Sequence, residues 1–197
     1  MSQRQDGNQV NEYGVRHGLL EIVRVLLLSV AIVVPVRYFI AQPFIVRGAS
    51  MEPNFQDSQY LIVDEASFLF RDPHRSEVVV FRYPRDPSEF FIKRIVALPG
   101  EEIAIKGGRV TVANAQHPAG FALAEPYLDP PNRPSYPDMS PKKLNEDEYF
   151  VMGDNRDFSS DSRIWGVLSR KLITGRTLIR VWPSSQFGLI PSYGSGN

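Results

Sequence analysis

The chain has 197 residues, enough for one domain with a hydrophobic core, alone or with an appendage. It carries 22 Lys and Arg against 22 Asp and Glu, and this zero net charge argues against a nucleic-acid-binding protein, which needs a basic excess to neutralise phosphates. Cysteine is absent, which excludes thiol nucleophiles, disulfides and Cys-containing zinc sites. The histidines His17, His74 and His117 stand beside no carboxylates at ligand spacing, so we expect no metal site.

The apolar residues are concentrated near the N-terminus. Residues 25–36 contain no charged side chain. The wider window 19–44 adds three charged residues, all towards its ends, namely Glu21, Arg24 and Arg37. A helix that rises about 1.5 Å per residue needs about 20 residues to cross a bilayer core of about 30 Å, so this window is long enough to span a membrane.

Two other interpretations of this segment remain open. The uncharged stretch alone is short for a span and could form a buried core helix. A cleaved signal peptide is the second alternative, but no small residue stands two places before Ala41, as a cleavage site there would need. We predict an uncleaved signal anchor, one transmembrane helix over residues 19–42. It follows a tail at residues 1–18, whose first eleven residues are polar and expected to be disordered.

Beyond Pro43 the pattern changes to short apolar runs that are rich in β-forming residues and separated by turn residues. The runs expected as strands are 44–46, 60–63, 78–81, 90–92, 95–97, 103–105, 109–112, 149–153 and 178–182. Gly107-Gly108 predicts a tight hairpin between two of them. This spacing predicts a mainly β fold, a compact antiparallel β domain over residues 43–197.

Prolines set one part of this domain apart. Six of the sixteen prolines fall between Pro126 and Pro141, too dense for a central strand or a helix. We therefore expect residues 114–145 to form a Pro-rich excursion or loop.

Three segments carry residues that could do chemistry, and the first is Gly48-Ala49-Ser50-Met51-Glu52-Pro53. It directly follows an apolar strand. A glycine lets the backbone approach a ligand closely, and a serine at the junction of strand and turn can present its hydroxyl and its own N–H to a carbonyl. A serine beside a glycine in a turn is also a common structural arrangement, so this segment alone does not establish a nucleophile.

The second segment places Lys93 inside the apolar run 90–96. A serine nucleophile needs a base, and lysine qualifies only if burial lowers its pKa far below the unperturbed value of about 10.4. Arg94, one residue on, would point to the opposite face of the strand. The alternative is a lysine at a sheet edge that covers apolar surface with its stem.

The third segment is the polar loop 153–163. Its Asp, Asn, Ser and Arg residues allow many bonds between side chains and backbone, and Asp161 and Arg163 could form an ion pair. A calcium loop is a competing interpretation. The carboxylates at 154, 157 and 161 miss the EF-hand spacing and no Glu stands at its twelfth position, so we discount it.

Taken together, these segments resemble the type I signal peptidases, which are membrane-anchored serine proteases with a Ser-Lys dyad. Ser50-Met51-Glu52-Pro53 matches the nucleophile motif SMxP, and residues 77–84 match the strand that follows. Residues 93–100 match the general-base motif, and residues 153–163 match GDNxxxSxDSR in full. Four segments in the family's order are far more specific than any one of them, and the resemblance runs from the anchor nearly to the C-terminus.

The resemblance implies roles at the matching positions. Ser50 would be the nucleophile and Lys93, in its neutral form, the general base. The Ser50 N–H would supply one oxyanion donor, a contact whose loss typically lowers the rate about 100-fold to 1000-fold. Ser159 would orient the lysine amine by a hydrogen bond. The remaining supporting positions are Gly153 for close backbone approach, the ion pair Asp161–Arg163 that holds the loop, and Gly48, where some members have a second oxyanion donor.

The resemblance also implies a substrate. It would be the extended segment after the apolar core of a signal peptide in a secreted preprotein, paired to strand edges, with small side chains at the first and third positions before the cut. The pocket residues implied are Phe44, Val46, Met51, Phe55, Val80, Phe91 and Ile92. Asn54 departs from the family, which usually has Thr after this proline. Trp182 could join an interfacial apolar patch or belong to the core.

By the same resemblance, the chain is expected in the bacterial plasma (inner) membrane as a single-pass protein, with a cytoplasmic N-terminus and the β domain on the outer face. The lipid bilayer and the secretion translocon would be its other partners, without nucleic acid, cofactor or metal. A Ser-Lys self-cleaving repressor of the same broad fold is one alternative, but it would need a DNA-binding segment where this chain has an apolar run. A membrane-tethered β-rich scaffold or assembly protein with an inactive dyad is the other.

Overall fold

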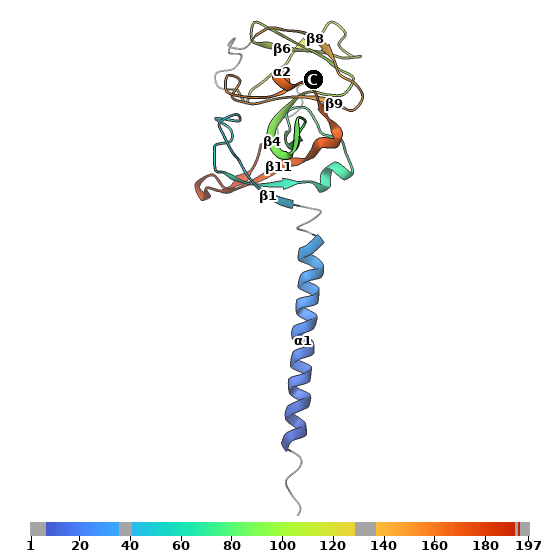
Figure 1. Cartoon of the computed structure of the whole chain (residues 1–197), viewed down its shortest axis with the longest axis vertical. Helices are drawn as coiled ribbons and strands as arrows, with labels where there is room; N and C mark the ends of the chain where they lie inside the picture. The colour runs from blue at the N-terminus through green and yellow to red at the C-terminus, as the bar shows by residue number, and fades with distance from the viewer. Residues whose placement is uncertain (1–6, 36–40, 129–136, 192, 194–197) are drawn as a thin grey trace, which may run out of the picture. The chain divides into compact units, whose positions relative to one another are not determined.

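The computed structural model of the chain describes residues 7–35, 41–128, 137–191 and 193 (Figure 1). Contacts between residues divide the chain into two units, Met1–Ile40 and Ala41–Asn197.

The first unit contains the helix α1 (Gly7–Pro35). It begins ahead of the predicted anchor and includes residues 7–11, which we expected to be disordered; a helix extends cheaply into residues next to an existing turn. The large apolar side chains from Leu19 to Val33 are exposed. Within the described ranges, no helix meets the combination of length and hydropathy expected of a membrane span. Residues 36–40 of the predicted anchor lie outside the described residues.

The second unit is built on a large antiparallel sheet with the strand order β1-β2-β11-β3-β4-β9-β10, and β12 pairs with β11. Its strands are β1 (Ala41–Ile45), β2 (Tyr60–Asp64), β3 (Val78–Tyr83), β4 (Asp86–Ala97), β9 (Glu148–Met152), β10 (Leu168–Ser169), β11 (Ile173–Trp182) and β12 (Gly188–Leu189). The predicted antiparallel β fold is therefore confirmed for this unit. The runs 90–92 and 95–97, which we expected as separate strands, belong to the single long strand β4.

A smaller antiparallel sheet has the order β7-β6-β5-β8. Its strands are β5 (Glu102–Lys106), β6 (Arg109–Ala113), β7 (Phe121–Ala122) and β8 (Met139–Lys143). The hairpin at Gly107-Gly108 is confirmed, and both glycines have the positive φ that such a turn requires. Strand β8 corrects the expectation of a loop in the Pro-rich stretch. It contains Pro141, which is tolerated because β8 lies at the edge of this sheet.

Short helices and three apolar clusters complete the unit. The helices are α2 (Ser162–Trp165) and the 3-10 turns η2 (Ala66–Leu69), η3 (Arg170–Leu172) and η4 (Ser184–Gln186). One cluster joins residues of the smaller sheet to residues of β4 and β9, and a second contains Phe81 and Trp165. The third contains Val46, Met51, Phe55, Leu61 and Val78 and supports the segment that carries Ser50. Trp182 is 56% exposed, which excludes the core as the alternative for this residue.

Candidate active site

Ser50 lies in the turn that follows β1. Two buried side chains anchor this turn, because Met51 and Phe55 are 0% and 1% exposed and pack in the third cluster. The Phe55 N–H donates to the Met51 carbonyl at 2.9 Å, which closes the turn after Ser50. Burial of its neighbours thus fixes the Ser50 backbone, while Ser50 itself is half-buried.

Lys93 lies in β4, and its side chain is only 4% exposed. The Lys93 Nζ donates to the Ser50 Oγ at 2.7 Å and to the Ile92 carbonyl at 2.8 Å. Burial lowers the pKa of Lys93 to about 8. The carboxylates of Asp161 and Asp154 favour the ammonium and raise this pKa, but their effect is smaller than that of burial. Lys93 pairs with Val79 of β3, and its burial distinguishes it from the alternative interpretation, a sheet-edge lysine whose ammonium stays in water. A substantial fraction of this amine is neutral near pH 8 and able to accept a proton.

Gly153 brings the polar loop 153–163 against Ser50. A Cβ at this position would lie 2.3 Å from the Ser159 Oγ and 2.3 Å from the Ser50 carbonyl oxygen, closer than van der Waals contact permits. Next to it, the Asn155 N–H donates to the Ser50 carbonyl at 3.1 Å, and the Asn155 Nδ2 donates to the Ala49 carbonyl at 3.0 Å. The loop therefore binds the backbone of Ala49 and Ser50 directly, and only glycine fits at its closest point.

Asp161 holds both ends of this loop by hydrogen bonds. Its buried carboxylate accepts from the Gly153 N–H at 2.9 Å and from the Arg163 guanidinium at 2.7 and 2.8 Å, and it also caps the N-terminus of α2. Burial alone would raise the pKa of Asp161, but the Arg163 cation and these hydrogen bonds outweigh burial and lower it. Asp161 is therefore ionised, and the ion pair with Arg163 is present.

In the structure of the described residues, neither Ser159 nor Gly48 forms a hydrogen bond to Ser50 or Lys93. The Ser159 Oγ is buried without a hydrogen-bond partner in the described part of the chain, so its implied bond to Lys93 is not formed here. The hydroxyl still helps to lower the pKa of Asp161, although their geometry falls short of a hydrogen bond. Gly48 has φ +79°, a conformation that glycine adopts at little cost, and its N–H donates to Asp57 at 2.7 Å.

A groove of about 630 Å³ opens over Ser50 and Lys93. Five of the seven implied pocket residues line it, namely Phe44, Val46, Val80, Phe91 and Ile92. Met51 and Phe55 do not line it and belong to the core below. The groove also has a polar part that we did not predict, formed by Arg47, Ser88, Glu89 and Ser160. We started the strand at residue 90 because of the prolines before it, whereas β4 begins at Asp86.

Two strand edges border this groove. β1 pairs with β2 alone, and β9 pairs with β4 only along 94–97, so residues 90–93 of β4 pair with β3 on one side only within the described chain. Free backbone groups on such edges can add an extended peptide as a further strand.

No cluster of three or more His, Cys, Asp or Glu residues in the described ranges could hold a metal ion. Where Ser50 and Lys93 meet, the groove offers a serine hydroxyl and a lysine amine.

The family model described as "Signal peptidase, peptidase S26" matches residues 19–182, which is most of the chain. The chain belongs to this signal peptidase family.

Two relatives illustrate the similarity. A "Probable signal peptidase I-2" from Synechocystis sp. is 37% identical over 177 residues, covering 87% of this chain and 77% of the relative. A "Signal peptidase I" from Leptolyngbya laminosa is 36% identical over 185 residues, covering 89% of this chain and 87% of the relative. A solved signal peptidase I from Enterococcus faecalis is 26% identical and covers 54% of this chain and 97% of its own, with a TM-score of 0.46. The family assignment does not depend on that partial likeness.

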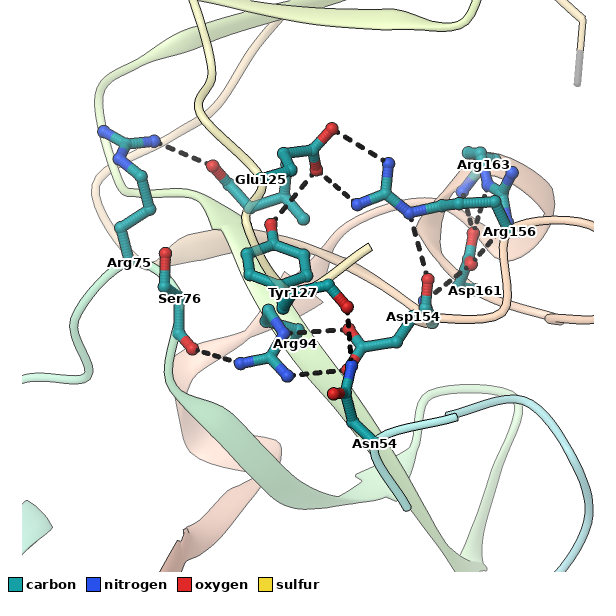
Figure 2. A network of polar contacts seen from close by, with 12 residues as sticks. Asn54, Arg75, Ser76, Arg94, Glu125, Tyr127, Asp154, Arg156, Asp161 and Arg163 are labelled. Carbon is teal, nitrogen blue, oxygen red and sulfur yellow. Dashed lines mark hydrogen bonds and ion pairs between the residues drawn. The ribbon is translucent and has the colours of Figure 1, made fainter. Parts of the chain in front are cut away.

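Buried ion pairs around this signal peptidase site are what sequence reasoning missed. Arg94 pairs with Asp154 (Figure 2). The distance between Arg94 Nη2 and Asp154 Oδ2 is 2.6 Å, and the two side chains are 2% and 0% exposed. Arg156 pairs with Glu125 in the same region (Figure 2), and these side chains are 6% and 0% exposed. The signal for Arg94 was its place in an apolar strand, but nothing in the local pattern indicated which carboxylate it would meet.

Proposed function

We propose that the chain is a membrane-bound serine endopeptidase that removes N-terminal signal peptides from secreted preproteins, with Ser50 as nucleophile and Lys93 as general base. The observation that carries this proposal is the 2.7 Å contact between the buried Lys93 Nζ and the Ser50 Oγ at the floor of the groove. Membership of the signal peptidase family supports it and does not favour a scaffold with an inactive dyad.

In this mechanism the neutral Lys93 amine takes the Ser50 hydroxyl proton while the Oγ attacks the scissile carbonyl. The Ser50 N–H stabilises the oxyanion that forms. The Lys93 ammonium then gives its proton to the leaving amine as the peptide bond breaks, which leaves an acyl ester on Ser50. Lys93 next takes a proton from a water molecule, whose oxygen attacks the ester, and finally returns a proton to the Ser50 Oγ.

The groove suits an extended substrate segment with small side chains. The edges of β1 and β4 offer backbone partners along both sides, and the apolar lining residues leave shallow space above Ser50. We therefore infer that small residues at the first and third positions before the cut enter this groove.

We further propose that residues 19–42 anchor the chain in the bacterial plasma membrane, with residues 1–18 cytoplasmic and residues 43–197 on the outer face. The support is the row of exposed large apolar side chains on α1 from Leu19 to Val33, which would be costly in water. The bilayer and the secretion translocon are then the partners, in addition to preproteins.

The test is cleavage of a purified preprotein by the full-length protein in detergent. Ser50→Ala, Lys93→Ala and Lys93→Arg should each abolish cleavage, the last because a guanidinium does not release its proton. Ser184→Ala and Lys106→Ala, at exposed positions, are matched controls that should retain cleavage. Far-UV circular dichroism should show native folding for all five. Cleavage near the wild-type rate by any of the three site variants would contradict the proposal.

A further inference from the structure

Four of the six residues in the segment Leu123–Leu128 of the Pro-rich stretch are buried, and this segment contacts the polar loop 153–163. Leu123, Glu125, Tyr127 and Leu128 are each no more than 8% exposed. A charged residue inside such a segment must be compensated, because a buried unpaired carboxylate is strongly unfavourable. Its polar contacts therefore show what this segment holds in place.

Glu125 is bound from two sides (Figure 2). Its carboxylate accepts from both terminal nitrogens of Arg156, one at 3.2 Å and one in a very short contact. The Tyr127 hydroxyl donates to the same carboxylate at 3.1 Å. Burial, together with the Glu125 charge, raises the pKa of Tyr127, so this hydroxyl stays protonated and keeps donating. Glu125 thus holds the Arg156 guanidinium in one orientation.

Arg156 in turn holds the backbone of Gly153 by a hydrogen bond. The Arg156 Nε donates to the Gly153 carbonyl at 3.0 Å, while the Gly153 N–H donates to Asp161 at 2.9 Å. Both backbone groups of Gly153 are therefore fixed. Because Gly153 touches the Ser50 carbonyl region and Asn155 donates to that carbonyl, movement of this loop would move the nucleophile.

Asn54 adds a second link between the same parts. Its Nδ2 donates to the Tyr127 carbonyl at 2.7 Å and to the Asp154 carboxylate at 2.9 Å. Asn54 is the position where this chain departs from the family's usual Thr, and a threonine hydroxyl has one proton to donate instead of two. The Leu123–Leu128 segment therefore contacts both the turn that carries Ser50 and Asn54 and the polar loop 153–163.

We propose that Glu125 is a positioning residue for the peptidase reaction: by fixing Arg156 against the Gly153 carbonyl, it keeps the Ser50 Oγ within reach of the Lys93 Nζ. This inference rests on the proposed Ser50–Lys93 chemistry. A misplacement of about 1 Å in a catalytic group lowers a rate by about 100-fold, so loss of this constraint should act on turnover more than on substrate binding.

The test compares Glu125→Gln with Glu101→Gln in the full-length protein in detergent. Glu101 is a matched control, because it too forms a buried ion pair, with Arg75 at 2.6 Å, and its other side-chain bonds go to Leu98 and Asn114. The probe is an internally quenched peptide with Ala at the first and third positions before the cut. Glu125→Gln should lower kcat by about 10-fold to 100-fold with KM within about twofold. Glu101→Gln should keep kcat within about twofold, even where both variants lose similar thermal stability.

Amide hydrogen exchange supplies a readout that a purely structural role would not move. Glu125→Gln should speed exchange in residues 49–56 and 153–158, whereas Glu101→Gln should not. Arg156→Lys keeps the charge but not the guanidinium fork, so it should lower kcat in the same way, and it serves as the variant if Glu125→Gln does not fold.

Three results would overturn the inference: an unchanged kcat in Glu125→Gln or, if that variant does not fold, in Arg156→Lys; an equal loss of kcat in Glu101→Gln; or a loss of kcat without faster exchange near Ser50. If the wild-type protein itself fails to cut the peptide, the proposed function fails instead, and the exchange comparison still tests the links from Glu125 to Ser50.

Discussion

Replacement of Lys93 by Met should stabilise the protein at neutral pH while removing its activity. Burial lowers the pKa of Lys93 from 10.5 to about 8 in the folded protein. The unfolded chain therefore binds this proton more tightly than the folded protein does, so protonation of Lys93 favours unfolding. This destabilisation is complete below about pH 8, decreases as the pH rises from there, and disappears above 10.5. Lys93→Met has no such proton to bind and should lose this pH dependence.

The magnitude follows from the two pKa values. Linkage between protonation and folding gives a destabilisation by Lys93 of about 3 kcal/mol at pH 7 and about 1 kcal/mol at pH 10. The free energy of unfolding of Lys93→Met, minus that of the wild type, should therefore be about 2 kcal/mol larger at pH 7 than at pH 10. Differences in packing that do not depend on pH cancel in this comparison.

The assay is denaturant unfolding of the full-length protein in detergent, followed by far-UV circular dichroism at both pH values. Lys106→Met, at an exposed position of β5, controls for the loss of a lysine as such and should show the same difference from wild type at both pH values. If the free energy of unfolding of Lys93→Met minus that of the wild type is the same at both pH values, or is larger at pH 10, the reasoning that burial lowers the pKa of this amine is refuted.

Two further substitutions test the loop around Gly153. Gly153→Ala should lower cleavage of the peptide by at least about 100-fold, because its Cβ would lie 2.3 Å from both the Ser50 carbonyl oxygen and the Ser159 Oγ. Gly188→Ala, where a Cβ meets nothing within 4 Å, is the control and should cleave at the wild-type rate; equal activity of the two variants would count against the close approach. Asp161→Asn removes a carboxylate that raises the pKa of Lys93, so the pH at which kcat/KM rises should fall, and an unchanged or higher midpoint would contradict this assignment.

The strands were predictable because their signals are local. Short runs of β-branched and aromatic residues between Gly and Pro identify the strands around Gly107-Gly108 without knowledge of the rest of the chain. The motif around Ser50 and the apolar setting of Lys93 likewise carry their chemistry within a few residues. The prolines misled us in two places, before β4 and in β8, because edge strands and hairpin ends tolerate proline where central strands do not.

The pairing of buried charges was not predictable from sequence. Arg94 meets Asp154 across 60 residues, and Arg156 meets Glu125 across 31. Each arginine has several carboxylates at similar distances along the chain, and the choice among them depends on how the strands assemble. Whether an apolar side chain lines the groove or the core is equally a tertiary matter, which is why Met51 was expected in the pocket and lies in the core.

The central claim is that Lys93, with a pKa lowered by burial, is the base that activates Ser50. The most direct measurement is kcat/KM for cleavage of the Ala-containing peptide as a function of pH, because this quantity reports the ionisation of the free enzyme. We predict that kcat/KM rises with pH and reaches half of its maximum near pH 8, the pKa of Lys93 in the fold. A profile that is flat, or that rises only near the 10.5 of an ordinary lysine, would contradict the account.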